Sequence, residues 1–272
     1  MPEGDTVWLA AKRLHEAFAG EVLTRSDFRI PRLATADLSG RRVLEIVPRG
    51  KHMLTRVDAG LTLHTHLEMD GAWRIFDAGA RWTGGPGHEI RIVLGTGRRT
   101  AVGYRIPVIE LIETAQEFEV IGHLGPDLLA ADFDAAEAFR RLGAEPDAAI
   151  ADALLDQRNL AGIGNVYKSE VLFLSGVAPW TPVADVADLT RVVDLARRLL
   201  LANRERFQRI TTGSRRRGEE LWVYGRAGRP CRRCGTSISR RMQGQPGRER
   251  VTYWCARCQA GPDVTAAAIN DA

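Results

Sequence analysis

The stretch CRRCGTSISRRMQGQPGRERVTYWCARC, residues 231–258, holds all four cysteines of the chain as two Cys-x2-Cys pairs separated by twenty residues. This spacing is typical of four-thiolate zinc sites, in which two turns face each other across a tetrahedral metal ion. Two disulfides are the alternative, but the N-terminus lacks the apolar segment of a secretion signal, and disulfides belong to oxidising compartments. We therefore predict one structural zinc ion per chain, with the ligands Cys231, Cys234, Cys255 and Cys258.

Four protein ligands close the coordination shell of zinc, so we expect this metal to fold a hairpin and to do no chemistry. The segment around it is basic. Residues 213–258 carry twelve arginines against three glutamates, whereas the rest of the chain sums to −5. A basic segment on a slightly acidic body predicts a local surface that binds polyanions, although a merely solvated arginine-rich face remains the alternative.

Helical patterns precede the cysteine segment. Apolar residues recur at helical spacing in four segments, which are residues 133–143, 148–156, 166–176 and 188–210. Residues 211–220, TTGSRRRGEE, have the polarity of a loop, and the short runs LWVYG and VTYWC that follow have β-like composition. We expect a helical domain over about residues 130–210 and a β-containing ribbon after it.

Further towards the N-terminus the pattern changes from helix to strand. Short runs rich in Val, Ile, Leu and Thr, separated by turn residues, occupy residues 43–47, 52–57, 61–67, 73–76, 89–94 and 107–113. They predict a mostly antiparallel sandwich or barrel. An amphipathic helix over residues 5–18, which Asp5 or Thr6 could cap, precedes them.

The 272 residues and 44% apolar composition suffice for about two globular units and one small appendage. We place the domain boundaries at residues 2–120, 125–212 and 221–260. No apolar run of 18 or more residues occurs, so we expect a cytoplasmic protein, in the cytosol or nucleoid of a bacterial-type cell, that is not bound to a membrane.

Several motifs occur in the order found in one family. They are PEG at residues 2–4, RGK at 49–51, HLEMDG at 66–71, LGPDLL at 124–129, DQRNLAGIGNVYKSEVLF at 156–173, VYGR at 223–226 and YWCARCQ at 253–259. With them the chain, from residue 2 to about 259, resembles the formamidopyrimidine-DNA glycosylase/endonuclease VIII (Fpg/Nei) family. The resemblance implies an α+β fold with an N-terminal antiparallel β-sandwich and its opening helix, a C-terminal helix-two-turn-helix domain and a four-cysteine zinc-ribbon hairpin.

The same resemblance implies a DNA glycosylase and abasic-site lyase of base-excision repair that acts as a monomer on damaged double-stranded DNA. Removal of Met1 would expose the secondary amine of Pro2, and an N-terminal amine has a reference pKa of only about 8. Attack by that amine on C1′ of the damaged nucleoside would expel the base and form an iminium, which permits strand-cleaving elimination. By itself, Pro-Glu-Gly at residues 2–4 would indicate no more than an exposed N-terminus. The motifs further along the chain favour the catalytic interpretation instead.

Three further residues would assist this chemistry. Glu3 would protonate the sugar ring oxygen and later take a proton back, a task for a carboxyl group with a raised pKa. Lys51, otherwise a surface lysine, resembles the family lysine that binds a phosphate beside the lesion and assists β-elimination. Arg250 stands at the position of the family's ribbon arginine, which contacts the lesion's phosphate and is associated with δ-elimination.

The remaining candidates would hold DNA. Gly162 and Gly164 permit close approach of a phosphate to the helix that follows, and Asn165 would donate to the phosphate or cap that helix. Met69 is the candidate wedge for the gap left by the flipped nucleotide, with a core methionine as the alternative. The other predicted DNA contacts are His66, Tyr224, Glu68 and, on a looser match, His123.

Purine-directed members of the family carry further wedge residues at a position where this chain reads RTAVGYR, residues 99–105. They also carry a long loop before VYGR, whereas the corresponding segment here, residues 211–220, is short. Both departures favour an endonuclease VIII-like enzyme for oxidised pyrimidines. A purine-directed glycosylase is the first alternative. A non-catalytic protein that binds damaged DNA is the second, and it would need neither Pro2, Glu3 nor Lys51.

Overall fold

The computed structural model describes residues 2–247, 249–259 and 261, and the chain forms two compact units, residues 1–123 and 124–272. Met1, whose removal is expected, lies outside the described residues. So does residue 260, the last residue of the predicted ribbon. No helix in the described part is long and apolar enough to cross a membrane.

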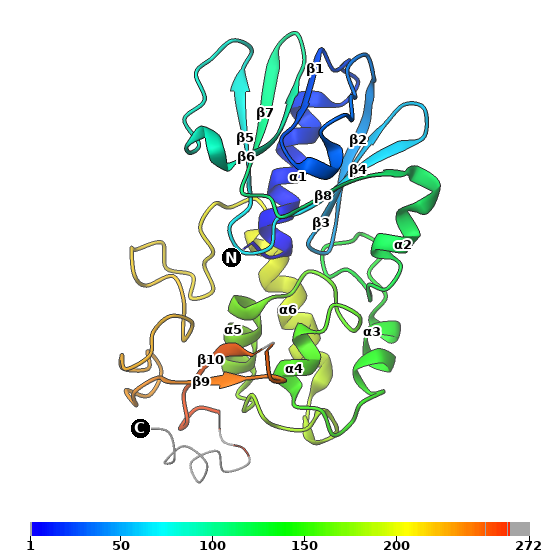
Figure 1. Ribbon diagram of the computed structural model, residues 1–272. Helices are drawn as coiled ribbons and strands as arrows, with labels where there is room; N and C mark the ends of the chain where they lie inside the picture. The colour runs from blue at the N-terminus through cyan, green and yellow to red at the C-terminus, as the bar shows by residue number, and fades with distance from the viewer. Residues whose placement is uncertain (1, 248, 260, 262–272) are drawn as a thin grey trace. The chain divides into compact units, whose positions relative to one another are not determined.

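The first unit holds two helices and eight strands (Figure 1). They are α1 (Gly4–Phe18), β1 (Arg25–Phe28), β2 (Val43–Arg49), β3 (His52–Val57), β4 (Leu61–His66), β5 (Ala72–Asp77), β6 (Ile90–Gly95), β7 (Arg99–Tyr104), β8 (Val108–Glu113) and α2 (Glu117–Ile121). All pairings are antiparallel and form two four-stranded sheets, β1-β6-β7-β5 and β2-β3-β4-β8. The structure thus adds β1 and β7 to the predicted strands.

One apolar core packs Phe18 of α1 against side chains from both sheets, among them Met53, Leu63 and Ile92. On β4 the apolar Leu61 and Leu63 alternate with polar residues, because successive side chains of a strand point to opposite faces, whereas on β3 the neighbouring Met53 and Leu54 are both buried. A second cluster around Val93 covers the other face of the β6–β7 pair. Two buried faces explain why residues 92–94, Ile-Val-Leu, are apolar without a break.

The prediction that Asp5 or Thr6 caps α1 was wrong. Glu3 is the N-cap, with an extended backbone and no capping hydrogen bond from its side chain. Its carbonyl oxygen accepts hydrogen bonds from the N–H groups of Thr6 and Val7, at 3.0 and 3.1 Å. The helix therefore begins directly after Glu3 and carries the first residues of the chain at its N-terminal end.

The second unit is helical and ends in a two-stranded hairpin. Its elements are α3 (Ala135–Leu142), α4 (Ile150–Leu155), α5 (Asn165–Ser175), α6 (Leu189–Asn203), β9 (Ser239–Gln243) and β10 (Arg250–Trp254). The fourth predicted helix, over residues 188–210, is too long. It ends at Asn203, because the buried side chain of Asn203 forms hydrogen bonds with both backbone groups of Ile210 and turns the chain into a loop.

The run LWVYG, residues 221–225, does not form the β structure that its composition predicts. The carboxylate of Glu170, fully buried on α5, accepts hydrogen bonds from the N–H groups of Trp222, Val223 and Tyr224 at 2.8 to 2.9 Å. These donors would otherwise enter a strand ladder. The ribbon's two strands are instead β9 and β10, which pair from Ser239↔Trp254 to Gln243↔Arg250.

Candidate functional site

The N-terminal end of α1 presents Pro2 and Glu3 next to each other. Pro2 is half-buried, whereas Glu3 has no exposed surface. The positive dipole end of α1 lies at this point, where a negative charge is favoured. If Met1 is removed, the secondary amine of Pro2 stands directly before a carboxyl group that is withdrawn from water.

Lys51 lies in the turn of the β2–β3 hairpin, whose register pairs Arg49 with His52 and leaves a two-residue loop. Gly50, the first residue of that loop, has a φ of 59°, and Lys51, the second, has a negative φ. This is the pattern of a type II′ turn, which favours glycine at its first position. The glycine of RGK therefore shapes the tight turn that presents Lys51.

The hairpin turn and the N-terminal end of α1 lie at the same end of the first unit (Figure 1). Gly20, just after α1, donates to the carbonyl oxygen of Val43, and the N–H of Ile46 donates to His15 Nδ1 at 3.1 Å, so β2 runs antiparallel to α1. From Ile46 to the turn is roughly 15 Å, and from His15 back to Glu3 is roughly 18 Å. Because the two lengths are similar, the hairpin turn and Glu3 lie at the same end of the unit.

Sequence reasoning missed a histidine network beneath the Lys51 turn. Glu110 Oε2 lies 2.9 Å from His64 Nδ1, and His64 Nε2 lies 2.8 Å from His52 Nδ1. The rings of His52 and His66 are 4.8 Å apart and those of His52 and His123 are 6.1 Å apart. The only advance signal was the spacing of His64 and His66, which places both on one face of β4.

Burial, reinforced by neighbouring positive groups, keeps the imidazoles of His52 and His66 neutral. It lowers the pKa of His52 to about 3, with further contributions from His66, His64, His123 and Lys51. Burial, Lys51 and His64 lower the pKa of His66 to about 4. The Nδ1 atom of His66 accepts the N–H of Glu68 at 3.2 Å, so its proton lies on Nε2. His66 can therefore donate a hydrogen bond without carrying charge.

The turn between β4 and β5 exposes the wedge candidate. Glu68, Met69 and Asp70 are all exposed, Met69 at 61%, and Glu68 takes a φ of 47°. Gly71 closes the turn, where a Cβ would lie 2.6 Å from the carbonyl oxygen of Leu67. Met69 is thus a surface residue, and the alternative that it belongs to the core is excluded.

In the second unit the structure brings together three predicted residues that are distant in sequence. The side-chain Nδ2 of Asn165, the first residue of α5, donates to the carbonyl oxygen of Val251 at 2.8 Å, directly after the exposed Arg250 on β10. The buried Oδ1 of Asn165 has no hydrogen-bond partner among the described residues. Tyr224 packs edge-to-face on Tyr253 of β10 at 5.1 Å.

The α5 helix is fastened to the ribbon. Besides Asn165, the buried Lys168 donates through Nζ to Thr252 Oγ1 at 2.6 Å. Glu170, on the same helix, holds residues 222–224 as described above, and burial raises the pKa of its carboxyl group. One helix therefore positions both Arg250 and Tyr224. Sequence periodicity could not indicate this role, because Lys168 and Glu170 looked like surface residues of an amphipathic helix.

The four cysteines form a compact cluster that could hold a metal ion, with all sulfur atoms within 4.8 Å of one another. The Sγ atoms of Cys231 and Cys258 are 3.9 Å apart, and those of Cys234 and Cys255 are 3.4 Å apart. A tetrahedron with metal–sulfur bonds of about 2.3 Å has edges of about 3.8 Å, so the cage fits such an ion. Burial and the neighbouring thiols raise the pKa of Cys258 to about 12, a cost that a bound cation removes.

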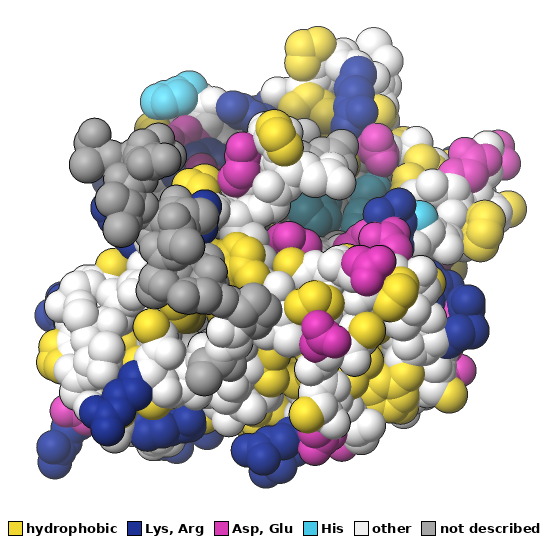
Figure 2. All heavy atoms as spheres, turned by 90° about the horizontal axis from the view of Figure 1, so that it is seen from below, with side chains coloured by type: hydrophobic (Ala, Val, Ile, Leu, Met, Phe, Trp, Pro, Cys, Tyr) yellow, Lys and Arg dark blue, Asp and Glu magenta, His cyan; other side chains and the backbone are white. Residues whose placement is uncertain are grey.

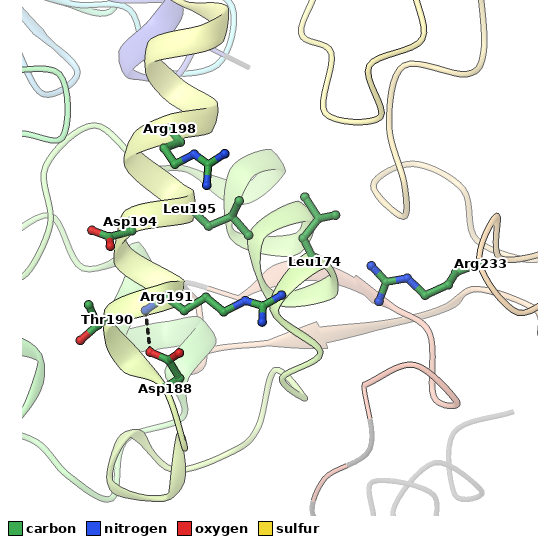
Figure 3. Close-up of a pocket in the computed structure, with 8 residues that line it drawn as sticks. All are labelled: Leu174, Asp188, Thr190, Arg191, Asp194, Leu195, Arg198 and Arg233. Carbon is green, nitrogen blue, oxygen red and sulfur yellow. Dashed lines mark hydrogen bonds between the residues drawn. The ribbon is translucent and has the colours of Figure 1, made fainter.

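A hollow of about 570 Å³ on the second unit is separate from this site (Figure 3). Arg191, Arg198 and Arg233 line it together with two aspartates and the apolar side chain of Leu174. None of the predicted site residues lies on its wall. The candidate site is therefore described by the helix ends, the turns and the ribbon rather than by this hollow.

Comparison with known proteins agrees with these features. Residues 1–105 match the formamidopyrimidine-DNA glycosylase N-terminal domain, and residues 124–201 match the formamidopyrimidine-DNA glycosylase H2TH domain. The chain is 62% identical to the "Probable endonuclease 8 2" of Streptomyces coelicolor, over 96% of this chain and 95% of that protein. It is 48% identical to the "DNA-(apurinic or apyrimidinic site) lyase Nei2" of Mycolicibacterium smegmatis, over 95% of this chain and 99% of that one.

Solved structures have the same fold. A complex of Lactococcus lactis Fpg (MutM) with DNA containing an oxidised pyrimidine superposes with a TM-score of 0.80 over 96% of this chain and all of that one, at 23% identity. The α+β architecture predicted from the motifs is thereby confirmed. By its two matched domains and its full-length relatives, the chain belongs to the formamidopyrimidine-DNA glycosylase/endonuclease VIII family.

Proposed function

We propose that this protein is a bifunctional DNA glycosylase and abasic-site lyase of base-excision repair that removes oxidised pyrimidines through a covalent intermediate on Pro2. The observation that carries the proposal is the fully buried carboxyl group of Glu3 directly after Pro2, at the N-terminal end of α1 and the same end of the unit as Lys51. Family membership supports the reaction class. Such an enzyme works where the chromosome lies, in the bacterial cytoplasm.

The reaction follows from the chemistry of these groups. The Pro2 nitrogen attacks C1′, the N-glycosidic bond breaks, and the base leaves with the bonding pair and takes up a proton. Glu3 donates a proton to the ring oxygen O4′ as the sugar opens, which produces the iminium. The iminium acidifies C2′–H; once a base removes that proton, electrons flow towards C1′ and the C3′–O bond breaks with the phosphate as leaving group.

The residues near the hairpin turn bind the phosphate beside the lesion. Lys51 supplies a positive charge, and the neutral Nε2–H of His66 supplies a directed donor. Because the pKa of His66 is lowered to about 4, this donor does not change its charge near neutral pH. Met69, exposed in the next turn, fills the gap in the base stack.

The second unit binds the DNA backbone at the N-terminal end of α5. Gly162, with a φ of 99°, and Gly164 precede that end, where the positive end of the helix dipole favours a phosphate. The side-chain amide of Asn165 donates a hydrogen bond to the carbonyl oxygen of Val251. Asn165 therefore mainly positions the neighbouring Arg250, whose exposed side chain reaches the phosphate. Tyr224, Glu68 and His123 remain proposed contacts to the flanking backbone.

The metal in the four-cysteine cluster is zinc, because a closed shell of four thiolates is the usual structural zinc site. Its role is to hold the hairpin that carries Arg250. The domains follow the boundaries given above, with the catalytic unit at residues 2–120, the helical unit at 125–212 and the ribbon at 221–260.

Removal of this metal is expected to abolish base excision as well as to weaken DNA binding, since the hairpin loses the bonds that hold it folded. Elemental analysis of the purified chain should find one zinc ion per molecule. After treatment with a chelator, excision should disappear and should return when zinc is added back. Full excision by a chain shown to be free of metal would contradict this role.

Two features support pyrimidine over purine lesions. Residues 99–104 form the strand β7, paired on both sides with β5 and β6, so no wedge loop is available there. Residues 211–220 fold back on themselves, since the N–H groups of Thr211 and Thr212 both donate to the carbonyl oxygen of Glu220. Little chain is left to cover a large flipped base.

Excision rates on matched duplexes test this preference. Thymine glycol and 5-hydroxycytosine duplexes should be cleaved at least about tenfold faster than an 8-oxoguanine duplex, because about 1.4 kcal/mol of differential binding in the transition state is sufficient for that factor. A duplex with a preformed abasic site controls for lyase activity. Faster excision of 8-oxoguanine would replace the pyrimidine assignment by the purine one, and failure to cleave any of these duplexes would indicate a protein that only binds damage.

A further inference from the structure

The loop after α6, residues 204–209, is fastened at its base. The Oδ1 atom of the fully buried Asn203 accepts the N–H of Ile210 at 2.8 Å, and its Nδ2 donates to the carbonyl oxygens of Ile210 and Leu199 at 3.0 and 2.8 Å. One amide side chain thus closes the loop and ties it to the helix. Such a closure gives the loop a defined shape that a frayed helix end lacks.

The loop exposes an aromatic ring. Phe207 has 80% of its surface accessible, although phenylalanine is a residue that proteins normally bury. The next residue, Gln208, donates through Nε2 to Glu220 Oε1 at 2.5 Å, which attaches the loop to the segment before Tyr224. The loop is thus anchored on both sides of an exposed ring.

The charge around this ring distinguishes it from the other large exposed ring. Phe118 on α2 is 78% exposed and lies between Glu117 and Glu119. Phe207 lies in the sequence Arg-Glu-Arg-Phe-Gln-Arg, with three arginines and one glutamate within three residues. An exposed aromatic ring among arginines is the pattern of surfaces on which nucleobases stack, whereas flanking acids repel a phosphate backbone.

The loop also borders the proposed phosphate site. The guanidinium of Arg209, its last residue, lies 5.5 Å from the ring centroid of Tyr167, which belongs to the first turn of α5. The N-terminal end of α5 is where Asn165 contacts the strand of Arg250. On the face shown in Figure 2 the Lys and Arg side chains are scattered and do not form one continuous patch.

We propose that Phe207 is a DNA-binding residue that stacks on a nucleobase left exposed when the damaged nucleotide leaves the duplex, while Arg204 and Arg206 contact the adjoining phosphates. The proposal rests on the proposed DNA-repair function and deepens it. The exposed base is either the one opposite the lesion or a neighbour in the same strand. Both offer the same ligand, the flat face of an unstacked base.

Affinity measurements on a duplex with a stable abasic-site analogue test the proposal. Phe207→Ala should raise the dissociation constant about 5- to 150-fold, the range expected for one base–aromatic stack. Phe207→Leu, which keeps an apolar side chain without a π-face, should also weaken binding, and Phe207→Trp should restore it. Phe118→Ala removes an equally exposed ring in acidic surroundings and should leave the affinity unchanged.

A fluorescent base identifies the stacking partner. 2-Aminopurine, whose emission is quenched by stacking, is placed opposite the abasic analogue in one duplex and beside it in another. Phe207→Ala should relieve quenching in one of the two duplexes, which names the base. Wild-type affinity in Phe207→Ala or Phe207→Leu, or unchanged quenching in both duplexes, would overturn the proposal.

These outcomes are separate from a failure of the proposed function. Borohydride trapping of the wild-type chain on abasic-site DNA tests the lyase without reference to Phe207. If wild type traps and Phe207→Ala binds as wild type does, the stacking proposal fails alone. If wild type neither traps nor cleaves, the enzyme assignment fails, and the affinity series still decides whether Phe207 contacts DNA.

Discussion

A chain extended by one glycine ahead of Pro2 is expected to lose the borohydride-trapped complex with abasic-site DNA. The extension turns the secondary amine into a tertiary amide, whose nitrogen lone pair is delocalised into the carbonyl and is no longer nucleophilic. The side chains of Pro2 and Glu3 are unchanged. The new terminal amine lies about 3.8 Å further along the chain, measured between Cα atoms, which removes it from the approach of about 3–3.5 Å to C1′ that attack requires.

Trapping yield on a denaturing gel, with the N-terminus of each preparation verified by mass spectrometry, measures this effect. The same glycine added at the C-terminus is the matched control and should leave trapping unchanged. Equal trapping by the N-terminally extended chain would place the nucleophile elsewhere, and Lys51 would then be the first residue to examine.

Glu3→Gln is expected to slow base excision by about 10² to 10⁴-fold, the usual contribution of a general acid. Glutamine has the same shape and can occupy the buried N-cap position, but it has no acidic proton to deliver to O4′. Cleavage of a preformed abasic site should fall less, because its aldehyde can condense with Pro2 without the departure of a base.

Single-turnover rates on a thymine-glycol duplex and on an abasic-site duplex provide the comparison. Asp5→Asn is the control, since Asp5 is a second buried acid, 2% exposed, in the first turn of the same helix. Its unfolding temperature should be determined beside that of Glu3→Gln to separate stability from chemistry. A similar loss of excision in both variants, or none in Glu3→Gln, would remove Glu3 from the acid's role.

Much of the fold followed from local patterns. The spacing of Cys231, Cys234, Cys255 and Cys258 predicted the compact thiol cluster, because each pair needs only a tight turn to bring its sulfur atoms together. The strands at residues 52–57 and 61–67 were predictable from their content of Val, Leu and Thr and from the turn residues between them, since such residues favour strands.

Patterns were wrong where a distant side chain competed for the backbone. Residues 221–225 have the composition of a strand, but Glu170, more than fifty residues earlier, takes three of their N–H groups. The helix that begins at Leu189 ends at Asn203, because the amide of Asn203 bonds Ile210. In both places a buried polar group required partners, and that demand outweighs propensity.

The candidate residues divide in the same way. The sequence by itself predicted the groups of the proposed reaction, since Pro2, Glu3 and Lys51 lie in short motifs, and it predicted the thiol cluster from the spacing of the cysteines. Only the tertiary structure decided that Asn165 bonds the strand of Arg250, that Glu110, His64 and His52 form one hydrogen-bonded chain, and that Phe207 is exposed among arginines. Periodicity records which face of an element is buried, whereas a contact between residues 86 apart exists only once two such faces have packed together.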